Sequence, residues 1–303
     1  MPEIIVGVND SAQAKDAVAF ARRLAGDGVT LALANAYPYE AWIGRTANPE
    51  YRDYLALEAA TTLSRARAAV DADDVTTHAI ADPSPARALQ GLAESHRATL
   101  IVVGSTHRGR VGRVLAGTTA DRLFHGAPCP VAIVPQGYAT RPAVPIRSIG
   151  VGYDGSEASR TAVHAAADIA RRAGGQLQVI RVFDATEIGT PAILSGPAYV
   201  SLHADFEQAA REDLDRLVAS LPASVEPQGV FLTGTPGHAL IAQSDALDLL
   251  LLGGRGYGPR VAVLLGGVSH MVVRDAACPV VVLPRGVPGA LAALFASRTE
   301  ASA

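Results

Sequence analysis

The chain has 303 residues, of which 49% are hydrophobic and 18% charged, and its formal net charge at pH 7 is −3. This length accommodates two ordinary domains, and the apolar content allows each to bury a core, which excludes wholesale disorder. The slightly acidic balance offers no broad basic surface for a nucleic-acid backbone, so nucleic acid is not expected as a partner.

Short β-branched runs alternate with longer segments of helical periodicity, the pattern of a parallel sheet covered by helices. The strands expected in the first half are Ile4–Val8, Val29–Ala34, Thr76–Ile80, Leu100–Val103 and Val131–Val134. Those expected in the second half are Ile149–Tyr153, Leu177–Val182, Val230–Leu232, Leu249–Leu252 and Val280–Leu283. Ser11 and Ser156 are expected to cap the first helix of each half, which should end near Gly26 and Gly174. The sequence thus predicts five strands in each half.

An internal repeat organises these elements. The segment that begins at Ile101, IVVGSTHRGRVGRVLAGTTADRLFHGAPCPVAIVP, has a twin in LLLGGRGYGPRVAVLLGGVSHMVVRDAACPVVVLP, which ends at Pro284. Cys129 and Cys278 are 149 residues apart, and no gap is needed between the two segments. The beginnings of the halves also correspond, because IIVGVNDSAQA is followed later by SIGVGYDGSEA. The repeat predicts two copies of one domain.

The segment QGYATRPAVPIR, residues 136–147, interrupts this periodicity with Gly and Pro and is expected to link the copies, with the boundary near Pro142. We therefore expect a first domain over residues 1–141, a second over 142–287 and a C-terminal tail over 288–303. The short apolar run Ala290–Ala296 in this tail is expected to be a frayed helix or disordered.

Several classes of protein are disfavoured. Cys129 and Cys278 lie in no CxxC or Cys/His ligand pattern, which argues against a disulfide scaffold or a zinc site and favours small core residues over redox sensors. The longest apolar stretches have the length of strands and no signal peptide follows Met1, so we expect a cytoplasmic protein without membrane association. The literal match to G-x-G-x-x-G at Gly150–Gly155 begins inside an expected strand and is interpreted as accidental.

A glycine-rich loop follows the fourth strand of each copy and leads into a helix. In the second copy Gly253, Gly256 and Gly266 follow the spacing G-x2-G-x9-G. The first copy keeps the outer positions as Gly104 and Gly117, followed by Thr118, and has His107 at the middle position. Backbone N–H groups in such a loop and at the start of the helix can bind phosphate oxygens, and glycine lets the backbone approach them.

These motifs resemble the universal stress protein family. ATP-binding members of that family carry G-x2-G-x9-G followed by Ser or Thr, a V-D-G-S turn after strand one, and C-P-V before strand five. This chain has VGVNDS from Val6, VGYDGS from Val151, and Cys-Pro-Val twice. The resemblance covers nearly the whole chain except the tail. It implies two doubly wound α/β domains, each a five-stranded parallel sheet of order 3-2-1-4-5.

The resemblance also implies that ATP or a related adenine nucleotide binds where the strand order reverses, with Mg2+ accompanying its phosphates. The nucleotide-binding residues that it implies are Asp154, Gly253, Gly256, Gly266 and Gly267 in the second copy, and Asn9, Gly104, Gly117 and Thr118 in the first. The alternative for Asp154 is an Asx-type turn that caps the following helix. The loops also contain arginines that could pair with phosphate, but we interpret them as solvated loop residues in preference to phosphate ligands: Arg108, Arg110, Arg255 and Arg260.

Neither copy has the complete motif. The first lacks the middle glycine and the turn aspartate, whereas the second lacks only the hydroxyl residue, which Gly267 replaces. A side chain at a glycine position obstructs a phosphate more than a missing hydroxyl does, so the sequence favours the second copy as the tighter site. In this family the fifth strand commonly pairs two domains, so we expect Val131–Val134 to pack against Val280–Leu283 as a pseudo-twofold pair.

The sequence therefore predicts a tandem protein that binds adenine nucleotide as a regulatory ligand in a stress response, with at most slow hydrolysis. The alternative is a nucleotide-free structural or signalling module that acts through protein contacts. An α/β ATP-pyrophosphatase is disfavoured, because the S-G-G-x-D-S loop of such enzymes is absent. The expected protein partners are further copies of this chain, in a homo-oligomer, and an unknown signalling protein.

Overall fold

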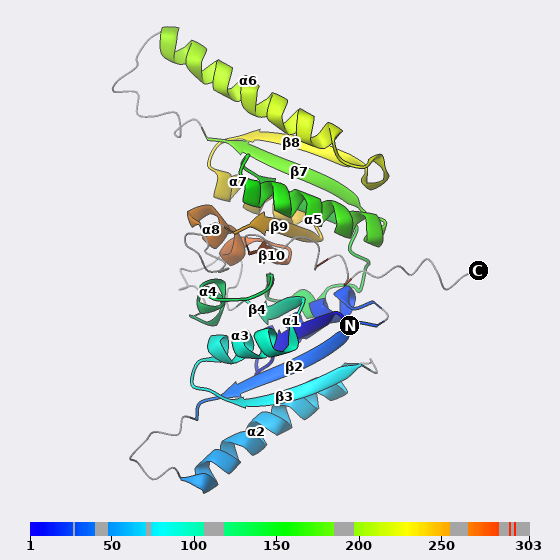
Figure 1. Cartoon of the computed structure of the whole chain (residues 1–303), viewed down its shortest axis with the longest axis vertical. Coiled ribbons are helices and arrows are strands. Elements are labelled where there is room, and N and C mark those ends of the chain that lie inside the picture. The colour runs from blue at the N-terminus through cyan, green and yellow to red at the C-terminus, as the bar shows by residue number, and fades with distance from the viewer. Residues whose placement is uncertain are drawn as a thin grey trace, which may run out of the picture.

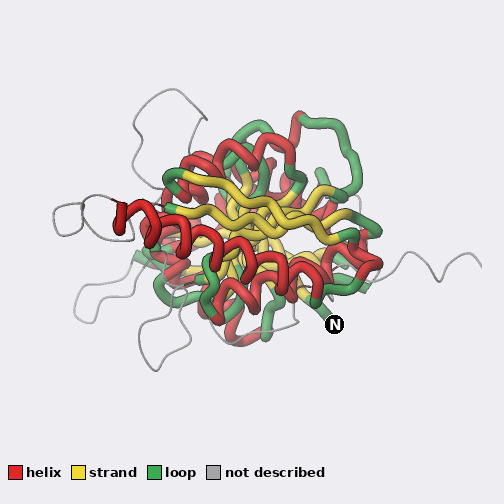
Figure 2. The backbone as a smooth tube through the Cα atoms, turned by 90° about the horizontal axis from the view of Figure 1, so that it is seen from above, coloured by secondary structure: helices red, strands yellow, loops and turns green. Residues whose placement is uncertain are grey.

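A computed structural model describes residues 1–26, 28–39, 48–70, 74–105, 118–184, 197–254, 266–284, 291 and 294. These residues form a single ten-stranded sheet with helices on both faces. Figure 1 shows the sheet running along the longest axis of the molecule, from β3 at one end to β8 at the other. Seen from above in Figure 2, the strands lie between two layers of helices.

The first domain alternates strands and helices in chain order. Its elements are β1 (Glu3–Gly7), α1 (Ala12–Leu24), β2 (Thr30–Tyr37), α2 (Pro49–Ala68), β3 (Val75–Ala81), α3 (Pro85–His96), β4 (Leu100–Gly104), α4 (Thr118–Phe124) and β5 (Val131–Val134). A short 3-10 helix, η1 (Tyr138–Thr140), follows in the linker.

The second domain repeats this order. Its elements are β6 (Ser148–Tyr153), α5 (Glu157–Ala173), β7 (Gln176–Phe183), α6 (Pro197–Ala219), β8 (Pro227–Thr233), α7 (Pro236–Gln243), β9 (Leu249–Gly253), α8 (Gly267–Asp275) and β10 (Val280–Leu283). Two 3-10 turns, η3 (Ala223–Val225) and η4 (Ser244–Ala246), precede β8 and β9. Every strand expected from the sequence is present, with ends that differ by up to three residues.

The helix signals in the sequence act as expected. The Ser11 hydroxyl accepts a hydrogen bond from the Ala14 N–H at 3.3 Å and caps α1. Ser156 caps α5 in the same way by accepting from the Ser159 N–H at 3.2 Å. Helix α5 ends at Gly174, whose φ of 61° is the left-handed conformation that glycine adopts without strain.

The two half-sheets join through their fifth strands, as predicted. The strand order is β3-β2-β1-β4-β5-β10-β9-β6-β7-β8, so each domain has the order 3-2-1-4-5, and β5 pairs with β10 antiparallel. The central pair is Ala132 with Val281, which are equivalent positions 149 residues apart. Because equivalent residues face each other, a pseudo-twofold axis passes through this pair.

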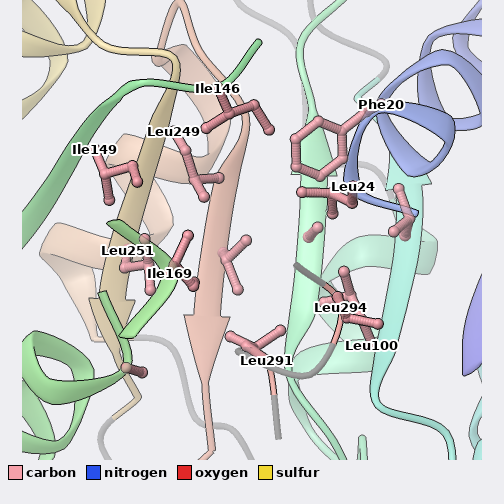
Figure 3. Close-up of a cluster of buried hydrophobic side chains, with 14 of the residues drawn as sticks. Phe20, Leu24, Leu100, Ile146, Ile149, Ile169, Leu249, Leu251, Leu291 and Leu294 are labelled. Carbon is pink, nitrogen blue, oxygen red and sulfur yellow. The ribbon is translucent and has the colours of Figure 1, made fainter. Parts of the chain in front are cut away.

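The hydrophobic core lies on both faces of the sheet. Helices α1, α2, α5 and α6 cover one face, and α3, α4, α7 and α8 cover the other. On the first face the buried side chains form one cluster across the domain boundary. Figure 3 shows Phe20, Leu24 and Leu100 of the first domain on one side of this cluster and Ile149 and Leu251 of the second domain on the other. The domains therefore share a core.

The C-terminal tail differs from its expectation at two positions. Leu291 is 3% exposed and Leu294 is fully buried, and both belong to the shared cluster. Figure 3 shows them among the labelled side chains of this cluster, with Leu294 beside Leu100. The Gly26 N–H also donates to the Leu294 carbonyl oxygen at 3.3 Å. The expected disorder is thus wrong for these two residues, because their apolar side chains are buried in the core that the domains share.

The linker packs against helix α1. Asp16 of α1 is 3% exposed, and its carboxylate accepts hydrogen bonds from the N–H groups of Gly137 at 2.9 Å and Ala139 at 2.7 Å. Tyr138 is buried with its ring edge-on to Phe20, at 5.6 Å between ring centroids. The guanidinium of Arg23 lies 4.4 Å from the Tyr138 ring centroid. The linker is therefore an ordered part of the first domain.

We predict that Asp16→Ala lowers the stability of the whole chain. The substitution leaves two N–H groups of the linker without their acceptor, at an expected cost of about 2–4 kcal/mol. Urea unfolding followed by circular dichroism should show a lower midpoint for Asp16→Ala. Asp168→Ala is the control, because Asp168 makes only an exposed ion pair with Arg171 at 3.6 Å. Equal midpoints for the two variants would contradict the role of Asp16.

Candidate functional site

A cavity of about 400 Å³ opens in the first domain at the carboxyl ends of β1 and β4. The strand order reverses between these two strands, where open α/β sheets bind their ligands. Its apolar walls come from β2, α3, β4 and β5 and consist of Ala34, Ala36, Pro85, Leu89, Val103 and Ile133. This arrangement provides an apolar slot of the size that a small organic ligand requires.

The turn after β1 supplies polar groups to the rim. Asn9 and Ser11 both line the cavity, and the Ser11 hydroxyl donates to Asn9 Oδ1 at 2.5 Å. The Asn35 amide of β2 donates to the Val8 carbonyl oxygen at 2.7 Å and fixes the end of β1. An asparagine amide has donors as well as an acceptor, so Asn9 retains the capacity to donate to a ligand.

Helix α8 of the second domain forms another part of the same cavity. His270, Val273 and Arg274 line it together with Thr119 and Asp121 of α4. His270 Nε2 lies 3.5 Å from Asp121 Oδ1 across the domain boundary. Arg274 binds Asp275 through Nε at 3.0 Å and Nη2 at 2.7 Å. The cavity therefore contains residues of both domains.

The corresponding turn of the second domain is built differently. Asp154 is exposed, and its Oδ1 accepts a hydrogen bond from the Ser156 N–H at 3.0 Å. This contact is the Asx-type turn that the sequence left open as the alternative for Asp154. In β7, Ile180 and Val182 occupy the positions that Ala34 and Ala36 have in β2, so larger side chains stand where the first domain has its apolar slot.

The first glycine of each loop has a packing role. A Cβ on Gly104 would lie 2.6 Å from the carbonyl carbon of Gln13 and closer still to its oxygen. A Cβ on Gly253 would lie 2.7 Å from the carbonyl carbon of Ala158. Both positions lie at the end of the fourth strand of their domain, against the first helix. Glycine is needed there because the helix backbone approaches too closely for any side chain.

The remaining predicted site residues are only partly placed. Gly266 is the N-cap of α8 and Gly267 its first residue, and Thr118 begins α4. Gly256, Gly117 and His107 lie outside the described residues, as do Arg108, Arg110, Arg255 and Arg260. Gly150 and Gly152 lie inside β6, as expected for an accidental dinucleotide motif. The structure thus brings Asn9 and Gly104 together at one cavity and leaves the phosphate loops undescribed.

Sequence reasoning missed the second-domain side of the cavity. His270 and Arg274 belong to no motif, and they reach the first domain only because β5 pairs with β10. It also missed the small residues Ala34 and Ala36, although their larger counterparts Ile180 and Val182 were visible in the repeat. Among the described residues, no group of three or more His, Cys, Asp or Glu side chains could hold a metal ion.

Both cysteines are buried before their fifth strands. Burial raises the pKa of the Cys129 thiol to about 12, and it raises the pKa of the Cys278 thiol to about 12 as well. Thiolate is the reactive form, so both side chains should be inert in the folded protein.

The fold and the cavity define a tandem pair of doubly wound α/β domains joined through one sheet. The sequence profile of the universal stress protein family matches residues 1–135 and again residues 145–284. The universal stress protein Rv2319c of Mycobacterium tuberculosis is 31% identical over 223 residues, which are 72% of this chain and 75% of that protein. The universal stress protein Rv2623 of the same organism is 29% identical over 290 residues, or 92% and 95% of the two chains.

Solved structures share the fold. A universal stress protein from Archaeoglobus fulgidus superimposes with a TM-score of 0.66 at 18% identity and covers 94% of this chain and 98% of its own. The protein PA1789 from Pseudomonas aeruginosa does so with a TM-score of 0.62 at 19% identity, covering 97% and 96%. This chain belongs to the universal stress protein family and contains two of its domains in tandem. Within the described residues, no helix is long and apolar enough to cross a membrane.

We predict that Gly104→Ala destabilises the fold in the absence of any ligand. The added methyl group collides with the backbone of Gln13, and relief of the collision requires α1 to shift, at an expected cost of about 1–3 kcal/mol. Gly267→Ala is the control, because no atom lies within 4 Å of a Cβ placed there, and alanine favours a helix. Thermal unfolding should separate the two variants. Equal melting temperatures would show that Gly104 is not required for packing.

We also predict that Cys129 and Cys278 resist thiol reagents in the native protein at pH 8. Because burial raises the pKa of each thiol to about 12, almost no thiolate forms at that pH. Both should react rapidly once urea unfolds the chain. A native protein that reacts as fast as the unfolded chain, measured with a chromogenic disulfide reagent, would contradict this prediction.

Proposed function

We propose that this universal stress protein binds an adenine nucleotide as a regulatory ligand in the first-domain cavity. The observation that carries the proposal is the position of the cavity at the reversal point of the strand order. Its volume of about 400 Å³ lies in the range of small-molecule sites. The walls of Ala36, Leu89 and Val103 can bury a planar base, and Asn9 can donate a hydrogen bond to a base nitrogen or a ribose oxygen.

We assign the main nucleotide site to the first domain because of the shape of its cavity. The glycine motif favours the second domain, where Gly253, Gly266 and Gly267 follow the family spacing more closely. The side chains of β2 favour the first, because Ala34 and Ala36 leave room that Ile180 and Val182 occupy in β7. Side chains that fill the slot exclude the base whatever the glycine loop can bind, so we give the shape of the slot more weight than the motif.

Regulation accounts for the cavity better than turnover. The acidic residue among its described lining side chains is Asp121, which is paired with His270. The carboxylate and the imidazole lie 3.5 Å apart, and we propose that this pair joins α4 to α8 at the rim of the cavity rather than activating a water molecule. We expect Mg2+ to bind together with the nucleotide, held mainly by its phosphates. Action in the cytoplasm, further association of chains and an unidentified signalling partner remain parts of this proposal.

A nucleotide-free module is the second candidate, and specific contacts favour it. Gly104 and Gly253 are explained by helix packing, and Asp154 is explained by its turn with Ser156. These motif residues therefore have reasons to be present that need no ligand. Under this candidate the domain pair acts only through protein contacts.

Calorimetric titration with ATP and Mg2+ separates the candidates and the two sites. We expect Ala36→Val to weaken binding at least about tenfold, because it gives β2 the side chain that β7 has at Val182. Asn9→Ala should weaken binding by about 1–3 kcal/mol through the loss of its hydrogen bond to the ligand.

Asp154→Ala is the matched control in the second domain and should leave the binding unchanged. If Asp154→Ala weakened binding and Ala36→Val did not, the nucleotide would belong to the second domain. A wild-type chain that binds no ATP at millimolar concentration would establish the nucleotide-free module instead.

A further inference from the structure

Among the described residues that line the first-domain cavity, the cationic side chains belong to the second domain. Asp121 is the charged residue among its described first-domain lining side chains, and it is acidic. The described cationic side chains that reach the cavity are Arg274 and, when protonated, His270, both on α8. A phosphate needs cationic or N–H partners when it leaves water. Within the described part of the cavity, helix α8 is the element that offers such cationic partners to an anionic ligand.

The pseudo-twofold axis explains how α8 reaches this place. Asp121 and His270 are equivalent positions, 149 residues apart, and they face each other at 3.5 Å. Figure 1 shows α4 and α8 next to each other beside the junction of the two half-sheets. In a symmetric dimer of identical domains this contact would join two copies of one residue. In the tandem chain it joins a carboxylate to an imidazole, which holds His270 at the rim of the cavity.

Arg274 lies where two cavities meet. A second cavity of about 480 Å³, between the domains, shares Ser105, Ile133, Val273 and Arg274 with the first. Arg141 of the linker also lines this second cavity. The pair of Arg274 with Asp275 uses Nε and Nη2 and leaves the Nη1 group outside that interaction. Arg274 therefore lines both cavities, whereas Arg141 lines the second.

We propose that the first-domain site is completed by the second domain, with Arg274 and His270 contacting the phosphate groups of the bound nucleotide. This inference rests on the proposed function and adds how the site recognises the anionic part of its ligand. Because the ligand then touches both sides of the domain junction, its binding holds α8 against the first domain.

The test compares adenosine and ATP, with and without Mg2+, on the full chain and two variants. Arg274→Gln removes the cation and breaks the pair with Asp275, whereas Asp275→Asn breaks the same pair and keeps the cation. For Arg274→Gln we expect the affinity for ATP to fall about three- to tenfold while the affinity for adenosine stays unchanged. For Asp275→Asn we expect the ATP affinity to be equal to or higher than that of the wild type.

The outcomes distinguish this inference from the proposed function. Wild type that binds ATP, with Arg274→Gln binding it equally well, overturns the composite site and leaves the nucleotide site standing. Equal losses in Arg274→Gln and Asp275→Asn, or a parallel loss of adenosine binding, also overturn it, because the pair would then act only on structure. Wild type that binds neither ligand overturns both proposals. His270→Gln should show a smaller selective loss for ATP than Arg274→Gln, since the guanidinium group that offers several N–H donors remains in place.

Discussion

The antiparallel pairing of β5 with β10 is the contact on which the rest of this structure depends. It joins Val131, Ala132 and Ile133 to the second half-sheet and removes the fifth-strand edge from both domains. Two five-stranded sheets thereby become one sheet, and on each of its faces the buried cluster spans both domains. The same pairing brings α4 and α8 together, and it is the reason why the cavity of one domain contains side chains of the other.

The glycines of the fourth-strand loops illustrate how one residue type serves two needs. Gly104 and Gly253 are required by the close approach of α1 and α5 to the strand ends, as the positions of Gln13 and Ala158 show. A short contact of this kind brings the first helix next to the loop after the fourth strand, where a ligand would bind. The first glycine of the motif is therefore required for packing even in a domain that does not bind a ligand.

The two copies have diverged in a complementary way. The turn after the first strand has Asn9 in one copy and Asp154 in the other, and the second strand has Ala34 in one and Ile180 in the other. Covalent linkage removes the requirement that equivalent positions be identical, so Asp121 can face His270 across the pseudo-twofold axis. Asymmetry of this type allows the first domain to keep the open space beside Ala34 and Ala36. The second domain lines the same cavity with Val273 and the cationic Arg274 of α8.

The sequence by itself determined the secondary structure, the repeat and the junction of the domains. Alternation of β-branched runs and capped helices is a local signal, and Ser11, Ser156 and Gly174 act as the sequence predicted. The pairing of the fifth strands was predicted from the resemblance to the family, and their apolar side chains agree with it, because an exposed hydrophobic edge needs a partner. The burial of Leu291 and Leu294 was not predictable, since their short run offers no periodicity and their partners are supplied by both domains.

Only the tertiary structure decided which side chains share a cavity. His270 and Arg274 lie more than 130 residues from Asp121 in the chain, and no local pattern connects them. Their proximity to Asp121 depends on the register in which β5 pairs with β10. A shift of this register by one residue would turn the side chains of the shifted strand to the opposite face of the sheet. The motif residues identified where a site could form, whereas the volume between Ala34, Leu89 and Val103 arises from how three separate elements, β2, α3 and β4, pack.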